Sequence, residues 1–252
     1  MTYAIDLAGR RALITGSGQR VGFATAKAMA DAGATVFIND VVAERAAEAV
    51  AEIEARGGRA ESAPFDVTDH DAVHAAVAEI GHLDILVNNA GHAGVQGWTF
   101  TPFHDSSREE WDRYFDINLY GVMYCTHAVL PSMIEHGWGR IVTIVSDAAR
   151  WGEAYMSPYA AAKAGAAGFA RSIAREVGRH GITVNNVSLR TVWYDQPDAD
   201  SEEGRKRLRA YILRRYGMPE DIAPMVTLLA SPMASWITGQ TIPVNGGYTV
   251  NL

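Results

Sequence analysis

Short runs rich in β-branched residues alternate with longer alanine-rich stretches along the whole chain. The runs predict strands at residues 11–15, 35–39, 59–65, 85–88, 141–146, 183–187 and 241–244. The stretches between them, such as residues 43–58, have helical periodicity. A strand, a helix and a second strand in succession form a right-handed βαβ unit, so the strands run parallel. The unbroken apolar run at 141–145 indicates a sheet covered on both faces. The sequence therefore predicts an α/β fold, with a doubly wound, seven-stranded parallel sheet and helices on both faces.

The organisation along the chain indicates one domain. Its 252 residues, 48% of them hydrophobic, are enough for one large core. No repeat, low-complexity tract or Pro/Ser-rich linker divides the sequence, so we expect a single domain over residues 1–252. The least regular stretch begins at Arg190, and we expect residues 190–216 to form a variable substrate loop at the carboxyl ends of the strands.

Charge and composition narrow the class of partner. The net charge of -7 and the pI of about 5.6 lack the basic footprint of a nucleic-acid-binding protein. The basic residues at 205–215 follow an acidic run, which favours a solvated helix face over a polyanion site. The single cysteine, Cys125, is typical of a reducing compartment. We find no secretory leader and no apolar stretch of about 18 residues, and so expect a cytoplasmic protein without a membrane span.

A glycine-rich turn, Thr-Gly-Ser-Gly-Gln-Arg-Val-Gly at residues 15–22, leads from the first predicted strand into a helix. Glycines there let the backbone approach a diphosphate, and the helix N-terminus offers N–H groups and a positive dipole. Such a turn alone is equally compatible with a simple tight turn, but its place in the first βαβ unit favours dinucleotide binding. The predicted cofactor contacts of this turn are Gly16, Ser17, Gln19, Arg20, Val21 and Gly22.

The second predicted strand is followed by Asp40, about twenty residues after the turn. A carboxylate there accepts hydrogen bonds from the adenosine ribose hydroxyls and repels a 2′-phosphate. The next residue is Val41 rather than a basic residue, so the sequence predicts NAD, with NADP the less favoured cofactor. The alternative role of Asp40, as N-cap of the following helix, is compatible with this one.

Tyr159 and Lys163 lie four residues apart in Ser-Pro-Tyr-Ala-Ala-Ala-Lys. With Ser157 as N-cap and Pro158 as the first helical residue, both side chains project from one face of a new helix. A phenol with a pKa of about 10 is a poor base at neutral pH, but a neighbouring ammonium lowers that pKa. Ser146 ends the fifth predicted strand, where its hydroxyl can hydrogen-bond a substrate oxygen.

Taken together, these motifs resemble the short-chain dehydrogenase/reductase superfamily over nearly the whole chain. The segments that carry the resemblance are the turn at 15–22, Asp66-Val67, Asn88-Asn89-Ala90-Gly91, Asn118, Ser146, Tyr159 to Lys163, and the tail from Gly217 to Gly247. The resemblance implies a Rossmann-type fold, a nicotinamide cofactor and a homotetramer or dimer. It implies hydride transfer to or from a small alcohol or ketone.

The resemblance also implies roles for individual residues. Tyr159 would act as general acid/base, Lys163 would lower its pKa and hold the nicotinamide ribose, and Ser146 would orient the substrate. Asn118 would interrupt its helix and hold a water in a proton relay to Lys163. The further cofactor contacts it implies are Asp66, Val67, Asn88, Ala90, Gly91 and Val192. The alternatives are that Asp66 caps a helix, that Asn118 is a buried helical amide and that Asn88 ties strands together.

Two departures from the family pattern bear on the cofactor and the loop. Arg20 stands where the family usually has glycine. It either crowds the cofactor or reaches a phosphate, and at the 2′ position it would weaken the preference for NAD. After the sixth predicted strand the usual Pro-Gly is replaced by Leu189-Arg190, which brings a cation near the reacting centre.

The segments predicted to face the substrate carry more aromatic than charged residues. We expect Trp151, Tyr155 and Trp193 to contact the substrate together with Ser146. This composition favours a compact, mostly apolar alcohol or ketone, while Arg150 and Arg190 keep an anionic substrate open.

The leading prediction is an NAD(H)-dependent enzyme that interconverts a secondary alcohol and a ketone. The alternatives are an NADP(H)-dependent 3-oxoacyl-type ketoreductase and a cofactor-sensing protein with little turnover. Among the eight histidines there is no HExxH pattern, and we expect no pair at i, i+4 spacing on a helix, so no metal site is predicted.

Overall fold

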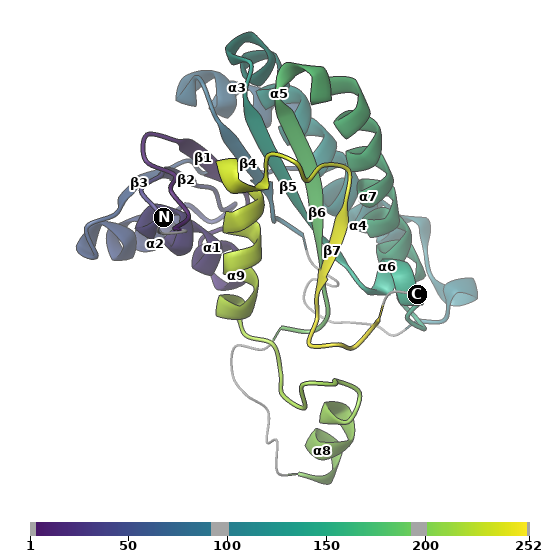
Figure 1. The fold of residues 1–252 in the computed structure, drawn as a ribbon. Helices are drawn as coiled ribbons and strands as arrows, with labels where there is room; N and C mark the ends of the chain where they lie inside the picture. The colour runs from purple at the N-terminus through teal and green to yellow at the C-terminus, as the bar shows by residue number, and fades with distance from the viewer. Residues whose placement is uncertain (1–3, 92–100, 193–200, 251–252) are drawn as a thin grey trace.

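All seven predicted strands form one parallel sheet in the computed structural model, which describes residues 4–91, 101–192 and 201–250. The strand order is β3-β2-β1-β4-β5-β6-β7 (Figure 1). The strands are β1 (Arg11–Ile14), β2 (Thr35–Ile38), β3 (Arg59–Ser62), β4 (Ile85–Asn88), β5 (Gly139–Ser146), β6 (Ile182–Leu189) and β7 (Thr241–Val244). The predicted fold class is confirmed. β3 is three residues shorter than the predicted run 59–65, and β5 and β6 are longer than predicted.

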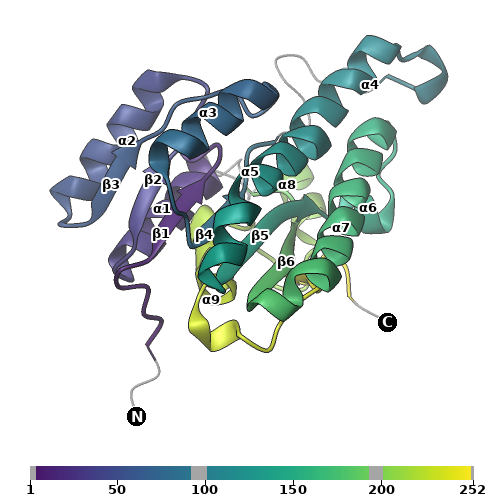
Figure 2. The same ribbon diagram turned by 90° about the horizontal axis from the view of Figure 1, so that it is seen from above.

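Helices cover both faces of the sheet. The α-helices are α1 (Arg20–Asp31), α2 (Ala43–Ala55), α3 (His70–Ile80), α4 (Arg108–Phe115), α5 (Gly121–His136), α6 (Ala148–Trp151), α7 (Ser157–Val177), α8 (Glu202–Leu208) and α9 (Pro219–Leu229). A core of α1, α2 and α9 side chains packs on one face, and a second core of α3, α5 and α7 side chains packs on the other. Figure 2 shows α3, α5 and α7 on the opposite side of the central strands from α9.

The order in which the strands are added to the sheet reverses between β1 and β4. From β1 the strand order runs outward to β3, and from β4 it runs outward to β7. The loops that follow β1 and β4 therefore leave the sheet on opposite sides and open a crevice at the carboxyl ends of these strands, where open α/β sheets bind ligands. This crevice receives the turn at residues 15–19 and the segment 89–91.

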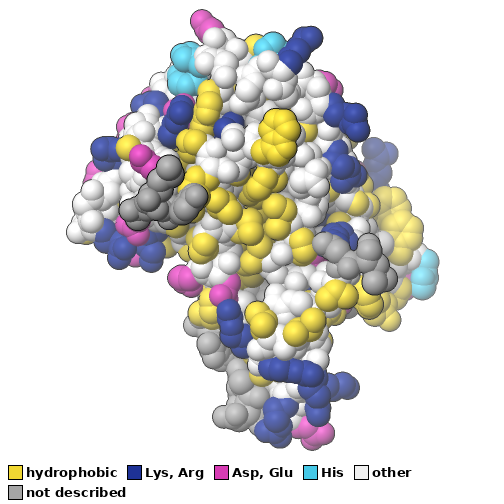
Figure 3. Space-filling view, viewed as in Figure 1, with side chains coloured by type: hydrophobic (Ala, Val, Ile, Leu, Met, Phe, Trp, Pro, Cys, Tyr) yellow, Lys and Arg dark blue, Asp and Glu magenta, His cyan; other side chains and the backbone are white. Residues whose placement is uncertain are grey.

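The predicted loop at 190–216 contains a short helix, α8, which projects beyond the carboxyl edge of the sheet (Figure 1). Lys and Arg side chains gather on this projecting segment (Figure 3). Within α8, Arg207 pairs with Glu203 one turn away, as expected for a helix face with opposite charges. In the part of the chain that the structure describes, no helix is both long and apolar enough to cross a bilayer.

Candidate active site

A cleft of about 950 Å³ opens at the carboxyl ends of the central strands. It brings together residues from most of the segments that the sequence singled out between β1 and β6. The predicted site residues that line it are Gly16, Gln19, Arg20, Val21, Gly22, Asp40, Asp66, Val67, Ala90, Gly91, Ser146, Tyr159, Lys163 and Val192.

The turn after β1 packs so tightly that two of its positions admit only glycine. Gly16 has a φ of +61°, and a Cβ there would lie 2.9 Å from the Cα of Ala90. A Cβ on Gly22 would lie 2.3 Å from the backbone oxygen of Gly16. The side-chain amide of Asn89 donates to the backbone oxygens of Thr15 and Gly16, at 2.9 Å each. The turn is therefore held directly against the segment that follows β4.

The first turn of α1 is suited to an anion. Gln19 is the N-cap but makes no side-chain capping bond, and the first turn carries no acidic residue. The N–H groups at this helix start and the positive end of its dipole consequently face the cleft. Arg20 has a φ of +59°, a left-handed conformation that glycine adopts without strain. This conformation explains why the family usually has glycine at the position of Arg20.

Ser17 does not line the cleft, contrary to the predicted cofactor contact. Its side chain is fully buried, and its hydroxyl donates to the backbone oxygen of Ile14 at 2.7 Å. Its backbone N–H donates to the backbone oxygen of Asn39. Ser17 thus lies behind the turn, because a small hydroxyl residue can satisfy the strand end inside the core.

Asp40 lies in the cleft at the end of β2 and is only 4% exposed. Its Oδ1 accepts from the backbone N–H of Val42 at 3.0 Å and from Nη2 of Arg45 at 2.7 Å. The N-cap of α2 is Val42, so the alternative role of Asp40 as N-cap is wrong. A Cβ on Gly18 would lie 2.7 Å from Oδ2 of Asp40, so this carboxylate stands against the glycine-rich turn.

Asp66 and Asn88, two further predicted cofactor contacts, differ in their position. Asp66 lines the cleft, and its Oδ1 accepts from the backbone N–H and the hydroxyl of Thr68, both at 2.8 Å. Asp69 is the N-cap of α3, so Asp66 does not cap that helix. Asn88 is buried and does not line the cleft; its amide donates to the hydroxyl of Thr126 at 3.2 Å. The Asn88 side chain therefore joins β4 to α5, whereas the predicted alternative was that it ties strands together.

Tyr159, Lys163 and Ser146 meet at one end of the cleft. Tyr159 and Lys163 lie one turn apart on α7, and both are buried. Tyr159 hydrogen-bonds Ser146 at the end of β5, and Nζ of Lys163 donates to the backbone oxygen of Ile144 at 2.9 Å. α7 begins at Ser157 with Met156 as N-cap and no side-chain cap. The predicted capping by Ser157 is therefore wrong by one position, although the face that carries Tyr159 and Lys163 is unchanged.

Asn118 lies in a π-helical turn, Asp116–Tyr120, between α4 and α5. The predicted interruption of its helix is confirmed. Asn118 is fully buried, and its amide donates to the backbone oxygen of Tyr114 at 3.0 Å. A Cβ on Gly91 would lie 2.6 Å from Oδ1 of Asn118 and 3.0 Å from Nζ of Lys163. Asn118 and Lys163 therefore converge on Gly91, which has to be glycine.

The charges around Tyr159 differ from the expectation. Burial raises the pKa of Tyr159, while the hydrogen bond from Ser146 and the charge of Arg190 lower it. Arg190 is a cation acting on Tyr159 that the sequence analysis did not connect with it, and the lowering expected from Lys163 stays a prediction. Burial lowers the pKa of Lys163 to about 8. Arg190 lines the cleft and is held by Glu153, with 2.6 Å between Nη1 and Oε2.

The predicted substrate contacts are only partly in place. Trp151, the last residue of α6, and Tyr155, in the turn before α7, are 68% and 57% exposed and do not line the cleft. Trp193 lies outside the described residues. Arg190 and Val192 also line a second, smaller cavity of about 150 Å³ together with Tyr211 and Leu213. The 190–216 segment thus supplies aromatic and apolar side chains beside the cleft that the sequence analysis did not single out.

Asn39 and Arg45 are further cleft residues that the sequence analysis missed. Oδ1 of Asn39 accepts from the backbone N–H of Gly16 at 3.2 Å, and its amide donates to the backbone oxygens of Ala63 and Phe65. The sequence signal that could have identified Asn39 is an amide residue at the end of a buried strand. Burying a polar side chain there costs free energy unless the side chain is hydrogen-bonded, for example to neighbouring loops. For Arg45 the sequence signal is its position in the first turn of α2, five residues after Asp40.

Comparisons with known proteins agree with this geometry. A family profile described as enoyl-(acyl carrier protein) reductase matches residues 16–249. The 7alpha-hydroxysteroid dehydrogenase of Escherichia coli is 35% identical, with 96% of this chain and 95% of that protein covered. The 3-oxoacyl-[acyl-carrier-protein] reductase of Synechocystis is 37% identical, with 96% and 97% covered.

A solved structure gives the same result in three dimensions. The gluconate 5-dehydrogenase of Burkholderia cenocepacia, in complex with NADP and tartrate, superposes with a TM-score of 0.89 at 33% identity and covers 98% of both chains. These proteins and this chain share the parallel sheet and a length of about 250 residues. The chain therefore belongs to the short-chain dehydrogenase/reductase superfamily of NAD(P)-dependent oxidoreductases that act on CH–OH and C=O groups.

Proposed function

We propose that the protein interconverts a secondary alcohol and a ketone with NAD(H), and that Tyr159 is the general acid/base. The observation that carries this proposal is the meeting of Tyr159, Ser146 and Lys163 at one end of the cleft. A phenol, a hydroxyl and an ammonium around one point are the groups needed to move a proton to or from a substrate oxygen.

The cleft residues fit a nicotinamide dinucleotide. The turn at 15–22 leaves no room for a Cβ at Gly16 or Gly22, so the backbone can approach a diphosphate at the start of α1. Asp40 and Asp66 would hold the adenosine side, while Ala90 and Gly91 would line the middle. Tyr159, Lys163 and Val192 would hold the nicotinamide side. When bound there, the nicotinamide ring would supply the hydride acceptor for alcohol oxidation or the hydride donor for ketone reduction.

The protein's own part of the reaction is proton transfer and orientation. In alcohol oxidation the Tyr159 phenolate takes the proton of the substrate hydroxyl, and in ketone reduction the Tyr159 phenol returns it. Ser146 hydrogen-bonds the same substrate oxygen and holds it next to Tyr159. Lys163 would relay the proton to a water held by Asn118, whose Oδ1 lies across Gly91 from Nζ of Lys163.

Substitution of Tyr159 tests the chemistry. Tyr159→Phe removes the proton-transfer group but keeps the ring, so we expect kcat to fall by about 10²- to 10⁴-fold with cofactor binding retained. Tyr114→Phe is the matched control, because its ring lies 6.2 Å from that of Tyr159 and it has no proposed role. Unchanged turnover in the Tyr159→Phe variant would overturn the proposed mechanism. A wild-type chain that binds cofactor and turns over no alcohol or ketone would favour the cofactor-sensing alternative.

The preference for NAD over NADP rests on Asp40. Its buried carboxylate stands beside the glycine-rich turn and engages Arg45, so a 2′-phosphate would meet a negative charge and a cation that is already paired. Fluorescence titrations with NADH and NADPH are expected to show tighter binding of NADH. Asp40→Ala should shift the ratio of the two dissociation constants by at least about tenfold toward NADPH, whereas the exposed Asp31→Ala should leave it unchanged.

A second candidate is NADP(H)-dependent reduction of a 3-oxoacyl thioester. It is supported by the Synechocystis relative named for that activity and by the basic side chains around α8 (Figure 3). Parallel assays with a 3-oxoacyl thioester and with cyclic and aryl ketones, each with NADH and NADPH, distinguish the two candidates. Higher kcat/KM for the thioester with NADPH would replace the leading proposal.

The substrate proposed under the leading function is neutral and mostly apolar. Arg190, one of the two cations considered for an anionic substrate, is already paired with Glu153. Its guanidinium carbon lies 4.1 Å from the Tyr248 ring centre. The cavity beside it is lined by Tyr211, Leu213 and Val192. Secondary alcohols without a carboxylate are therefore expected to have the higher kcat/KM.

A further inference from the structure

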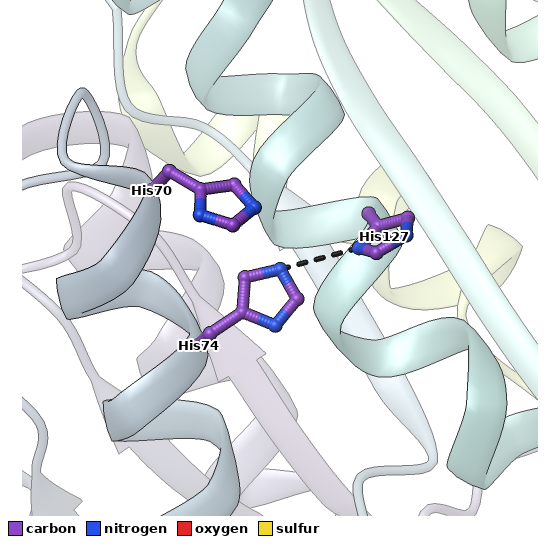
Figure 4. A group of neighbouring side chains, drawn as sticks. All are labelled: His70, His74 and His127. Atoms are coloured by element: carbon purple, nitrogen blue, oxygen red, sulfur yellow. Dashed lines mark hydrogen bonds between the residues drawn. The ribbon is translucent and has the colours of Figure 1, made fainter.

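Three histidines from two helices face one another on the molecular surface. None of the three lines the cleft. His70 and His74 lie one turn apart on α3, and His127 comes from α5. Figure 4 shows the three rings turned toward one another in the gap between these helices. The expectation that no histidine pair has i, i+4 spacing on a helix is wrong, because His70 and His74 form such a pair.

The spacing of the ring nitrogens suits a metal ion. One nitrogen of each ring lies within 4.8 Å of the other two. Nε2 of His74 and Nδ1 of His127 are 3.2 Å apart, and two nitrogens bound to one tetrahedral zinc at about 2.0–2.1 Å are separated by about 3.4 Å. The distance between these two nitrogens, now joined by a hydrogen bond, is therefore close to the distance between two ligands of one metal ion.

A neighbouring carboxylate orients the third ring. Nδ1 of His70 lies 2.9 Å from Oδ1 of Asp71. A carboxylate that accepts from one ring nitrogen of a histidine leaves the other nitrogen unprotonated as a ligand, an arrangement common around bound zinc. Figure 4 shows the second nitrogen of His70 directed toward the other two rings.

The ring of His70 is also held from α5. Tyr124 of that helix packs edge-on against His70, with ring centres 5.2 Å apart.

We propose that His70, His74 and His127 form a binding site for one divalent transition-metal ion, with zinc as the first choice, which clips α3 to α5. Imidazole nitrogen is a ligand that zinc, copper and nickel prefer, whereas magnesium and calcium prefer oxygen. Three protein ligands leave a fourth position for water. Because these residues lie outside the lining of the cleft, the ion acts on the stability of the α3–α5 pair and not on the reaction.

Calorimetric titration of the untagged full chain with ZnCl₂, after removal of metals with a chelator, tests the site. We expect one zinc ion per chain at the tightest site, no comparable heat with MgCl₂, and a melting temperature higher by about 5 °C at a hundredfold excess over Kd. His74→Gln and His127→Gln should each weaken binding by at least about tenfold, since loss of an outer partner alone costs that much. With Co²⁺ as probe, the wild type should show the visible absorption bands of a tetrahedral site.

His104→Gln is the matched control, because this side chain is 79% exposed on a different segment and should leave zinc binding unchanged. Zinc binding that survives in His127→Gln would overturn the three-ligand site and leave the pair on α3 alone. Equal binding by the wild type and the His74→Gln/His127→Gln variant would overturn the proposal altogether. NADH titration of the same variants serves as the folding check. Retained NADH binding together with lost zinc binding assigns the loss to the histidine site and not to the cofactor cleft.

Discussion

Arg190 follows β6, at a position where the resemblance predicted Pro-Gly. It is held in the cleft by Glu153 and by Tyr248, whose hydroxyl lies 3.1 Å from Nη2. Its charge lowers the pKa of Tyr159, which burial otherwise raises. A departure from the family pattern therefore supplies a positive charge next to the group proposed to carry the proton.

Changes at Arg190 and Glu153 should shift the pH profile of alcohol oxidation in opposite directions. Oxidation requires the Tyr159 phenolate, so activity rises as pH passes through the pKa of Tyr159. Arg190→Met removes the charge that lowers this pKa, and the rising limb of the kcat profile should move to higher pH by about one unit. Glu153→Gln leaves that charge uncompensated, so the limb should move to lower pH.

Arg190→Lys keeps the charge and serves as the control for the Arg190→Met variant. The measurement is kcat for oxidation as a function of pH at saturating NAD⁺. If Arg190→Met and Arg190→Lys move the rising limb equally, the effect comes from the shape of the side chain and the electrostatic account fails.

At the level of elements, the carboxyl ends of β5, β6 and β7 are tied together by one buried carboxylate. Asp147, which follows β5, is 1% exposed. It accepts from the hydroxyl of Ser188 on β6, from the amide of Asn245 after β7 at 2.6 Å and from the hydroxyl of Thr249 at 3.0 Å. The C-terminal segment that carries part of the family resemblance is therefore bound to β5, which ends at Ser146.

Asp147→Ala should destabilise the fold strongly, because it leaves the side chains of Ser188, Asn245 and Thr249, the first and last of them buried, without this acceptor. We expect the free energy of unfolding in urea to fall by roughly 3 kcal/mol or more. Asp31→Ala is the matched control: Asp31 is 51% exposed and paired with Arg56, and an exposed pair contributes only about 0–1 kcal/mol. Similar losses in the two variants would contradict the role given to Asp147.

At the scale of the whole molecule, α7 presents small residues to its surroundings. Ala161 and Ala164 are exposed on it, and Gly165 and Gly168 are half-buried. Small side chains let a second helix approach closely, which agrees with the homotetramer or dimer implied by the family resemblance. Trp236, 99% exposed near β7, is a further apolar group that association would cover.

Sedimentation velocity should show the wild type as a tetramer of the 27.3 kDa chain. Ala164→Arg places a long charged side chain on the small-residue face of α7 and should produce smaller species. Ala51→Arg, at an exposed position of α2, is the matched control and should leave the sedimentation coefficient unchanged. A monomeric wild type at micromolar concentration would refute the predicted assembly.

The sequence by itself determined the elements and the residues that local geometry brings together. Strand and helix periodicities gave the seven parallel strands, because each period places side chains on the faces that an α/β sheet buries. Tyr159 and Lys163 share a face because they are four residues apart on a helix, and Asp40 and Ser146 reach the cleft because parallel strands end at one edge.

Only the tertiary structure decided contacts between segments that are distant along the chain. Ser17 turns inward and Asn88 bonds Thr126, although the motif alone assigned both to the cofactor. Arg190 acts on Tyr159 from a different strand end, and His127 meets His74 from 53 residues away. Such contacts depend on how helices and loops pack across the sheet, and sequence spacing carries no information about that packing once the residues lie on different elements.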